Sequence, residues 1–138
     1  MATYNKFQVF VENVAEKVHN LGSDQLVVAL TNTAPSVSNS VLTDITEISY
    51  TYCSSRNITT STSSQTSGTY KLVLTDLVLT ASDGSVGPFR YIVIYNDTAT
   101  NDPLICWYDF ESELTLGNGE TLTIDFSASK SFFNSNRF

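Results

Sequence analysis

The sequence is poor in charged residues and contains no long apolar run. Only 15% of its 138 residues are Asp, Glu, Lys or Arg, whereas about a quarter is usual in soluble proteins. Ser, Thr and Asn take their place, and a surface of hydroxyls and amides costs little to desolvate against another protein. No stretch approaches the roughly 20 apolar residues of a membrane-spanning helix. The composition therefore predicts a soluble domain that packs against neighbours.

Basic residues are also scarce. Seven Lys and Arg face fourteen Asp and Glu, which gives a net charge of −7 and a pI of about 4.4. Nucleic-acid binding requires a basic surface, and an anionic membrane repels an acidic protein. The N-terminus lacks the basic and apolar segments of a secretory signal, since Glu12 and Glu16 interrupt its pattern. We expect no binding to nucleic acid or membranes, and retention in the cytoplasm unless lysis releases the protein.

Cysteine is limited to Cys53 and Cys106, which lie far apart in the sequence. Without a secretory signal, both are predicted to be free thiols. One long-range disulfide, formed after release into an oxidising medium, is the alternative.

Motifs of catalysis and metal binding are sparse. The single histidine, His19, lies near the predicted end of a helix, where an interaction with the helix dipole explains it better than catalysis does. The chain has no Gly-x-Ser-x-Gly, His-Glu-x-x-His or Cys-x-x-Cys motif and no glycine-rich phosphate loop. We therefore expect a non-enzymatic protein that needs no cofactor.

Two groupings of acidic residues offer alternatives. Asp97, Asp102, Asp109 and Glu111 lie close in sequence and could share a calcium ion, although carboxylates in the loops of an acidic protein are usually solvated. Asp109 and Glu111 are two positions apart, which would place both on the sheet face of Trp107, as in a glycosidase cleft. Two surface carboxylates at the end of a strand are the favoured interpretation.

Helical periodicity is confined to the N-terminal segment. Apolar residues recur there every three or four positions, with polar residues between them. Thr3 or Asn5 could cap the start, and Gly22 could end the helix. The pattern predicts an amphipathic helix over residues 3–20 that docks on a sheet; a terminal arm packed on a neighbouring subunit is the alternative. The apolar stripe consists of Phe7, Phe10, Val11, Val14, Val18 and Leu21.

The remaining sequence favours short antiparallel strands separated by polar turns. Strands are expected within residues 25–31, 41–51, 68–79, 89–95 and 104–110, with a break in the third at Asp76. Residues 54–67 are interpreted as an exposed loop, with a Thr-rich edge strand as the alternative. Residues 114–126 predict a hairpin around Gly117-Asn118-Gly119.

The fold class is therefore mainly β. We expect an antiparallel β-sandwich or jelly roll over residues 25–126, with one N-terminal amphipathic α-helix, in a single domain of residues 1–138. A polar tail, residues 127–138, follows and carries Phe132, Phe133 and Phe138. Because exposed apolar clusters commonly mark interaction sites, these phenylalanines are the candidate interface. Alternatively, they close the domain's own sandwich.

Seven short stretches, in order over most of residues 1–126, carry a resemblance to a known family. They are residues 21–24 (LGSD), 28–35 (VALTNTAP), 44–48 (DITEI), 65–74 (QTSGTYKLVL), 85–91 (SVGPFRY), 95–98 (YNDT) and 102–105 (DPLI). Together they resemble a family of small virion structural proteins of tailed bacteriophages, of the capsid decoration or cement type. Two places depart from the pattern: residues 49–55 (SYTYCSS) replace a glycine-rich stretch, and Cys106 replaces a glycine.

The resemblance implies a virion component that is made in the cytoplasm of a host bacterium. We expect a decoration protein that binds the major capsid protein and copies of itself, as a dimer or trimer. The alternative is a tail-associated module that binds a receptor or glycan through exposed Tyr and Trp side chains. The two differ in copy number per particle, which is far higher for a decoration protein.

Overall fold

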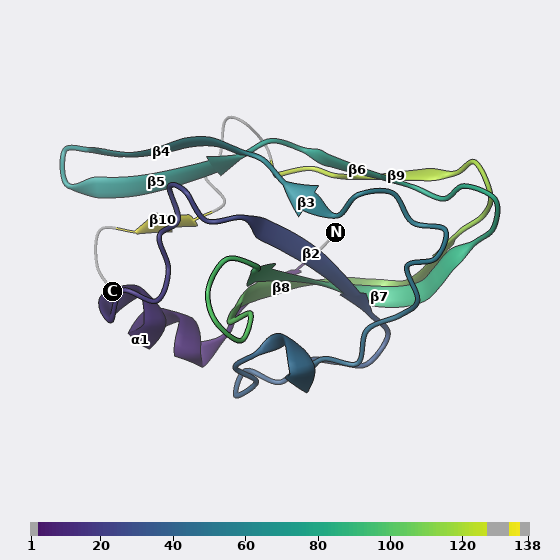
Figure 1. Ribbon diagram of the computed structural model, residues 1–138, viewed down its shortest axis with the longest axis horizontal. Helices are drawn as coiled ribbons and strands as arrows, with labels where there is room; N and C mark the ends of the chain where they lie inside the picture. Colours follow the sequence, from purple (N-terminus) through teal and green to yellow (C-terminus); the bar gives the residue numbers. More distant parts are fainter. Residues whose placement is uncertain (1–2, 127–132, 136–138) are drawn as a thin grey trace.

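The computed structural model describes residues 3–126 and the backbone of residues 133–135 (Figure 1). Within these residues the protein is mainly β, with antiparallel sheets and one α-helix, which confirms the predicted class and is consistent with a β-sandwich. A 3₁₀ turn spans Leu42–Asp44, and the helix is α1 (Gln8–Ala15). The strands are β1 (Thr3–Lys6), β2 (Leu26–Thr31), β3 (Asn57–Ile58), β4 (Thr60–Thr66), β5 (Thr69–Leu74), β6 (Leu77–Thr80), β7 (Val86–Asn96), β8 (Leu104–Leu116), β9 (Thr121–Ile124) and β10 (Phe133–Ser135).

One layer is a five-stranded sheet in the order β1-β8-β7-β2-β3. The six residues of β2 are all buried, so both faces of this strand are covered. Val28 and Leu30 face one hydrophobic cluster, whereas Val27 and Ala29 face another. Because both faces of β2 are buried, its sequence is a continuous apolar run and does not alternate between apolar and polar residues.

The opposite layer consists of two smaller sheets, β10-β5-β4 and β6-β9. Strands β4, β5, β6 and β9 run along the top of Figure 1. Between the layers, Leu72, Leu74 and Leu79 join Ile92 and Ile94 of β7 in the main core. The predicted break at Asp76 is confirmed, because β5 ends at Leu74 and β6 begins at Leu77. There the Asp76 carboxylate accepts a hydrogen bond from the backbone N–H of Phe126, at 2.9 Å.

The outer face of the five-stranded sheet is covered by irregular chain and the start of α1. Phe7, immediately before the helix, packs on Trp107 of β8 with ring centroids 4.6 Å apart. Ile45, next to the 3₁₀ turn, joins the same cluster together with Val93 and Leu104. The central sheet therefore has a hydrophobic core on each of its two faces.

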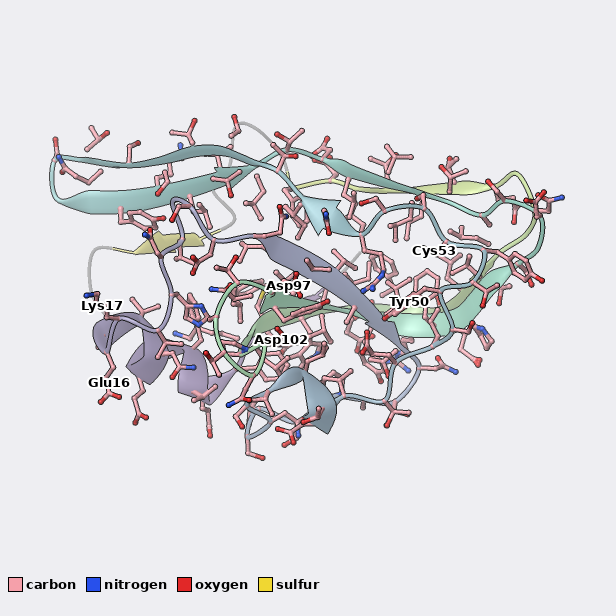
Figure 2. All side chains as sticks on the ribbon, viewed as in Figure 1. Glu16, Lys17, Tyr50, Cys53, Asp97 and Asp102 are labelled. Atoms are coloured by element: carbon pink, nitrogen blue, oxygen red, sulfur yellow. The ribbon has the colours of Figure 1, made fainter. Side chains whose placement is uncertain are left out.

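The segment 46–56 completes the free edge of β2. β3 pairs only with Leu26 and Val27, so the rest of β2 needs other partners. The Tyr50 hydroxyl accepts a hydrogen bond from Leu30 N–H at 2.9 Å, and the Arg56 guanidinium donates to the Val28 carbonyl at 2.6 Å. Side chains of Tyr50, labelled in Figure 2, and Arg56 thus satisfy backbone groups at the free edge of β2.

The N-terminal segment differs from the prediction of a helix over residues 3–20. Residues Thr3–Lys6 form β1, which pairs with β8, and α1 is only eight residues long. Neither Thr3 nor Asn5 caps the helix, because Phe7 occupies the N-cap without a side-chain hydrogen bond. After α1, Lys17 rather than Gly22 adopts the left-handed conformation, with φ of 69°. For residues 3–6, backbone pairing with β8 stabilises a strand more than the local sequence pattern favours a helix.

The buried face of this segment is only partly as predicted. Phe7 and Phe10 are fully buried, and Val14 packs against the main core. Val18 lies beyond the helix and is 37% exposed, so it is not a core residue.

Three predictions about strands are wrong. Residues 41–51 contain no strand, only the 3₁₀ turn and an isolated bridge between Val41 and Pro103. Residues 54–67 are not mainly a loop, since they include β3 and the polar strand β4; the alternative of a Thr-rich edge strand is correct. Residues 114–126 do not form a hairpin, because β9 pairs with β6 whereas the end of β8 pairs with β7. The turn at residues 117–120 instead carries the chain from one layer to the other. Cys53 and Cys106 are free, as predicted.

Candidate functional site

The phenylalanines predicted as an interface lie largely beyond what the structure describes. Phe132 and Phe138 are outside the described residues, and only the backbone of Phe133 is described. Phe133 is the first residue of β10 and pairs with Leu72 of β5. The choice between a clamp and a closure of the sandwich therefore stays open.

Asn96 ties together residues 21–24 (LGSD) and 95–98 (YNDT), two segments far apart in the sequence. Its side chain is fully buried, and its Nδ2 donates a hydrogen bond to Asp24 Oδ2 at 2.7 Å. Its Oδ1 accepts hydrogen bonds from the backbone N–H groups of Thr98, at 2.9 Å, and Ala99, at 3.1 Å. One amide thus joins the LGSD and YNDT stretches and holds the loop between β7 and β8 against the chain that follows α1.

The same amide determines the tautomer of His19. Because Asn96 Oδ1 accepts two backbone hydrogen bonds, Nδ2 is the atom that faces His19 Nδ1, at 3.0 Å. Nδ1 must then accept, which places the imidazole proton on Nε2. Nε2 is buried and has no hydrogen-bond partner among the described residues. Burial lowers the pKa of His19, and the Asp24 carboxylate opposes this effect more weakly.

His19 therefore does not lie at the end of the helix, where the sequence predicted an interaction with the helix dipole. α1 ends at Ala15, and His19 lies buried in the following chain, where its ring packs on Phe10 with centroids 5.2 Å apart. Sequence reasoning missed this role because the partners, Asn96 and Asp24, come from separate segments of the chain.

A cavity of about 680 Å³ opens beside His19, between the end of α1 and the β4–β5 hairpin. His19 contributes to the wall of this cavity, while its Nδ1 accepts from Asn96 and its Nε2 is buried. Among the described residues, the lining consists of Val14, Lys17, Val18, His19, Asn20, Leu21, Gly22, Asp24, Ser63, Tyr70, Thr98 and Ala99.

The acidic residues do not form the groupings considered from the sequence. Within residues 3–126, no three His, Cys, Asp or Glu side chains come together as a metal site. Asp109 instead pairs with Arg90 through two hydrogen bonds, at 2.8 and 3.1 Å, which lower the pKa of its carboxyl group. Trp107 is buried against Phe7, so its ring is not available to stack against a sugar beside Asp109.

Asp97 and Asp102 share the loop between β7 and β8, where Figure 2 labels both. Partial burial, and secondarily the charge of Asp97, raise the pKa of Asp102. Asp44, in contrast, accepts hydrogen bonds from the backbone N–H groups of Ser40 and Val41, which lower the pKa of its carboxyl group. The Asp44 carboxylate thus stabilises a turn, whereas Asp97 and Asp102 lie in a loop.

The outer strand β4 presents an uncharged polar surface. Its residues from Ser61 to Thr66 are exposed, and the strand contains only Thr, Ser and Gln. It forms the edge of its sheet, next to β5. The signal in the sequence was the high Thr content, which favours strands even where both faces are polar.

In comparisons with known proteins, the chain matches no family model, no curated protein and no solved structure. No helix in the described part of the chain is long and apolar enough to cross a membrane.

Proposed function

We propose that this protein is a non-enzymatic structural component of a bacteriophage virion, a capsid decoration or cement protein. It binds the major capsid protein and copies of itself, and it stabilises the assembled shell. It needs no cofactor, and it is made in the cytoplasm of the host bacterium before it joins the particle.

The observation that carries this proposal is the exposed, uncharged strand β4 on a chain of net charge −7. Hydroxyl and amide groups can be buried against a protein surface without the desolvation penalty of ionised groups. A lattice presents many equivalent sites, so linked copies gain avidity although each contact is modest. A polar strand of this kind suits attachment to an ordered protein lattice.

The positions that carry the family resemblance support a scaffold role. Asn96 and Asp24 hold two segments together, and Thr31 donates a hydrogen bond to the carbonyl of Thr46. Gly87 has a φ of 120°, and a Cβ there would lie 2.8 Å from the carbonyl oxygen of Leu114. These residues stabilise the fold and form no reactive site. This is what we expect if the proposed family shares an architecture and not a reaction.

The test is reconstitution on particles that lack the protein. Purified protein is added to such particles, bound copies are counted by gel densitometry, and their position is determined by cryo-electron microscopy. We expect saturable binding over the head in many copies, and heads that withstand heat better than undecorated ones. If particles without the protein keep normal head stability but fail to adsorb to cells, a receptor- or glycan-binding tail module replaces this proposal.

A further inference from the structure

We propose that β4 pairs antiparallel with β4 of a second copy, so that the two β10-β5-β4 sheets become one continuous sheet. The inference deepens the self-association in the proposed function. It is tested on the isolated protein, so its outcome does not depend on binding to a capsid.

The position of β4 leaves one of its sides open. Among the described residues its only strand neighbour is β5, and the sheet ends there. The strand follows the upper margin of the molecule in Figure 1. The side chains from Ser61 to Thr66 are exposed, so no described segment covers this edge.

The turn after β4 determines which backbone groups face outward. Ser67 and Gly68, with φ of 52° and 83°, form a two-residue turn between the paired residues Thr66 and Thr69. In such a hairpin the residues that flank the turn form a hydrogen-bonded pair, and hydrogen-bonded and non-hydrogen-bonded pairs then alternate. The N–H and C=O groups of Ser63 and Gln65 therefore point away from β5. No turn, loop or side chain in residues 3–126 forms a hydrogen bond with them.

A two-fold axis through Ser64 satisfies these groups. In that register Ser63 of one copy faces Gln65 of the other, and their outward backbone groups form hydrogen-bonded pairs. Thr62 faces Thr66, a cross-strand pair that stabilises sheets. The register uses only residues 62–66 and avoids the irregularity between Thr60 and Thr62.

The charge distribution favours a second copy as the occupant. Exposed edge strands are usually protected by Lys, other charged residues or Pro, and residues 62–66 contain none of these. Two chains of net charge −7 repel each other, but this strand lets them meet without facing carboxylates. One isologous contact then covers both open edges and closes the assembly.

The first experiment measures the mass of the isolated protein by sedimentation. We expect a dimer for the wild type and a monomer for the double variant Thr62→Glu/Thr66→Glu, in which carboxylates face each other across the axis. The variant Thr62→Lys/Thr66→Glu should dimerise again, because opposite charges then face each other. As a control for added charge, Thr121→Glu/Thr123→Glu alters exposed positions of β9 and should leave the dimer intact. Circular dichroism verifies that each variant is folded.

The second experiment tests the register by disulfide formation. Ser64 faces its own copy as a non-hydrogen-bonded pair, where Cα atoms are about 4.5 Å apart, within the range of a disulfide. Ser64→Cys should therefore give covalent dimers under mild oxidation. Gln65→Cys is the matched control and should not, because Gln65 faces Ser63. The wild type, with its native Cys53 and Cys106, provides the background.

A wild type that stays monomeric at high concentration would overturn the pairing, as would cross-linking of Gln65→Cys but not Ser64→Cys. Binding to particles by a monomeric wild type would leave the proposed function standing without this interface. Conversely, a dimer that binds no particle would support the pairing and contradict the capsid role.

Discussion

At the scale of single residues, the polar groups in the interior are more informative than the apolar ones. Asn96 is buried and uses both ends of its amide, so four other groups depend on it. A buried polar network stabilises a fold only while its members are satisfied. The loop between β7 and β8 therefore owes its position to one side chain.

We predict that Asn96→Ala lowers the free energy of unfolding by about 2–4 kcal/mol, because it leaves buried donors and acceptors without partners. Thr100→Ala, an exposed position of the same loop, is the control and should stay within about 0.5 kcal/mol of the wild type. Urea denaturation followed by circular dichroism measures both. Equal effects of the two substitutions would show that the amide network contributes little.

His19 predicts a dependence of stability on pH. Its folded-state pKa is lowered by burial, so the unfolded chain binds the proton more readily. Stability is then complete above the unfolded value of about 6.5 and falls as the pH decreases from there toward the folded-state pKa. Unfolding free energies measured between pH 7 and 5 should show this loss. The variant His19→Gln cannot titrate and should have a flatter profile over the same range.

At the scale of elements, the short helix is held by its buried phenylalanine rather than by its ends. α1 has no side-chain cap at its N-terminus and no acidic residue in its first turn. Eight residues are also too few for a helix to be stable on its own in water. Tertiary packing through Phe10, which is 1% exposed, must therefore supply the stability.

Phe10→Ala should cost about 3–5 kcal/mol of unfolding free energy, since it opens a cavity in the main core. Val18→Ala should change this quantity by less than about 0.5 kcal/mol, because Val18 is exposed beyond the helix. Thermal or urea unfolding compares the two variants. A stability of Phe10→Ala close to that of Val18→Ala would mean that α1 does not depend on this side chain.

The sequence predicted those elements whose pattern is local. β2 and β7 were expected close to their observed bounds, because runs of β-branched and aromatic residues favour strands wherever they pack. β1 was missed, because its hydrogen bonds come from β8 at the other end of the chain. The turn at residues 117–120 has the composition of a hairpin, and only the pairing of β9 with β6 shows that the chain changes layer there.

At the scale of the whole molecule, sites that depend on contacts between distant segments could not be predicted from the sequence. Asp24 and Asn96 lie far apart in the sequence, and only the folded chain shows that they share a hydrogen bond. The cavity beside His19 likewise combines side chains from α1, β4 and β5 and from two loops. In contrast, the sequence indicated both the polar character of β4 and its place at a sheet edge, as the alternative to a loop.

The tail gives the prediction that depends most on the whole molecule. Deletion of residues 131–138 removes β10, whose backbone pairs with Tyr70, Lys71 and Leu72 of β5. We expect the free energy of unfolding to fall by about 1–3 kcal/mol, because each lost backbone hydrogen bond contributes about 1 kcal/mol. Urea denaturation of the isolated protein measures this loss.

A shorter deletion separates the two interpretations of the tail. Removing residues 136–138 keeps β10 but eliminates Phe138, so stability falls if Phe138 closes the sandwich and stays close to that of the wild type if it does not. If Phe138 is an interface residue, this variant should nevertheless decorate particles at lower occupancy, as measured by gel densitometry of reconstituted particles. If the longer deletion keeps both full stability and full occupancy, then β10 is dispensable for the fold and the tail is not a clamp.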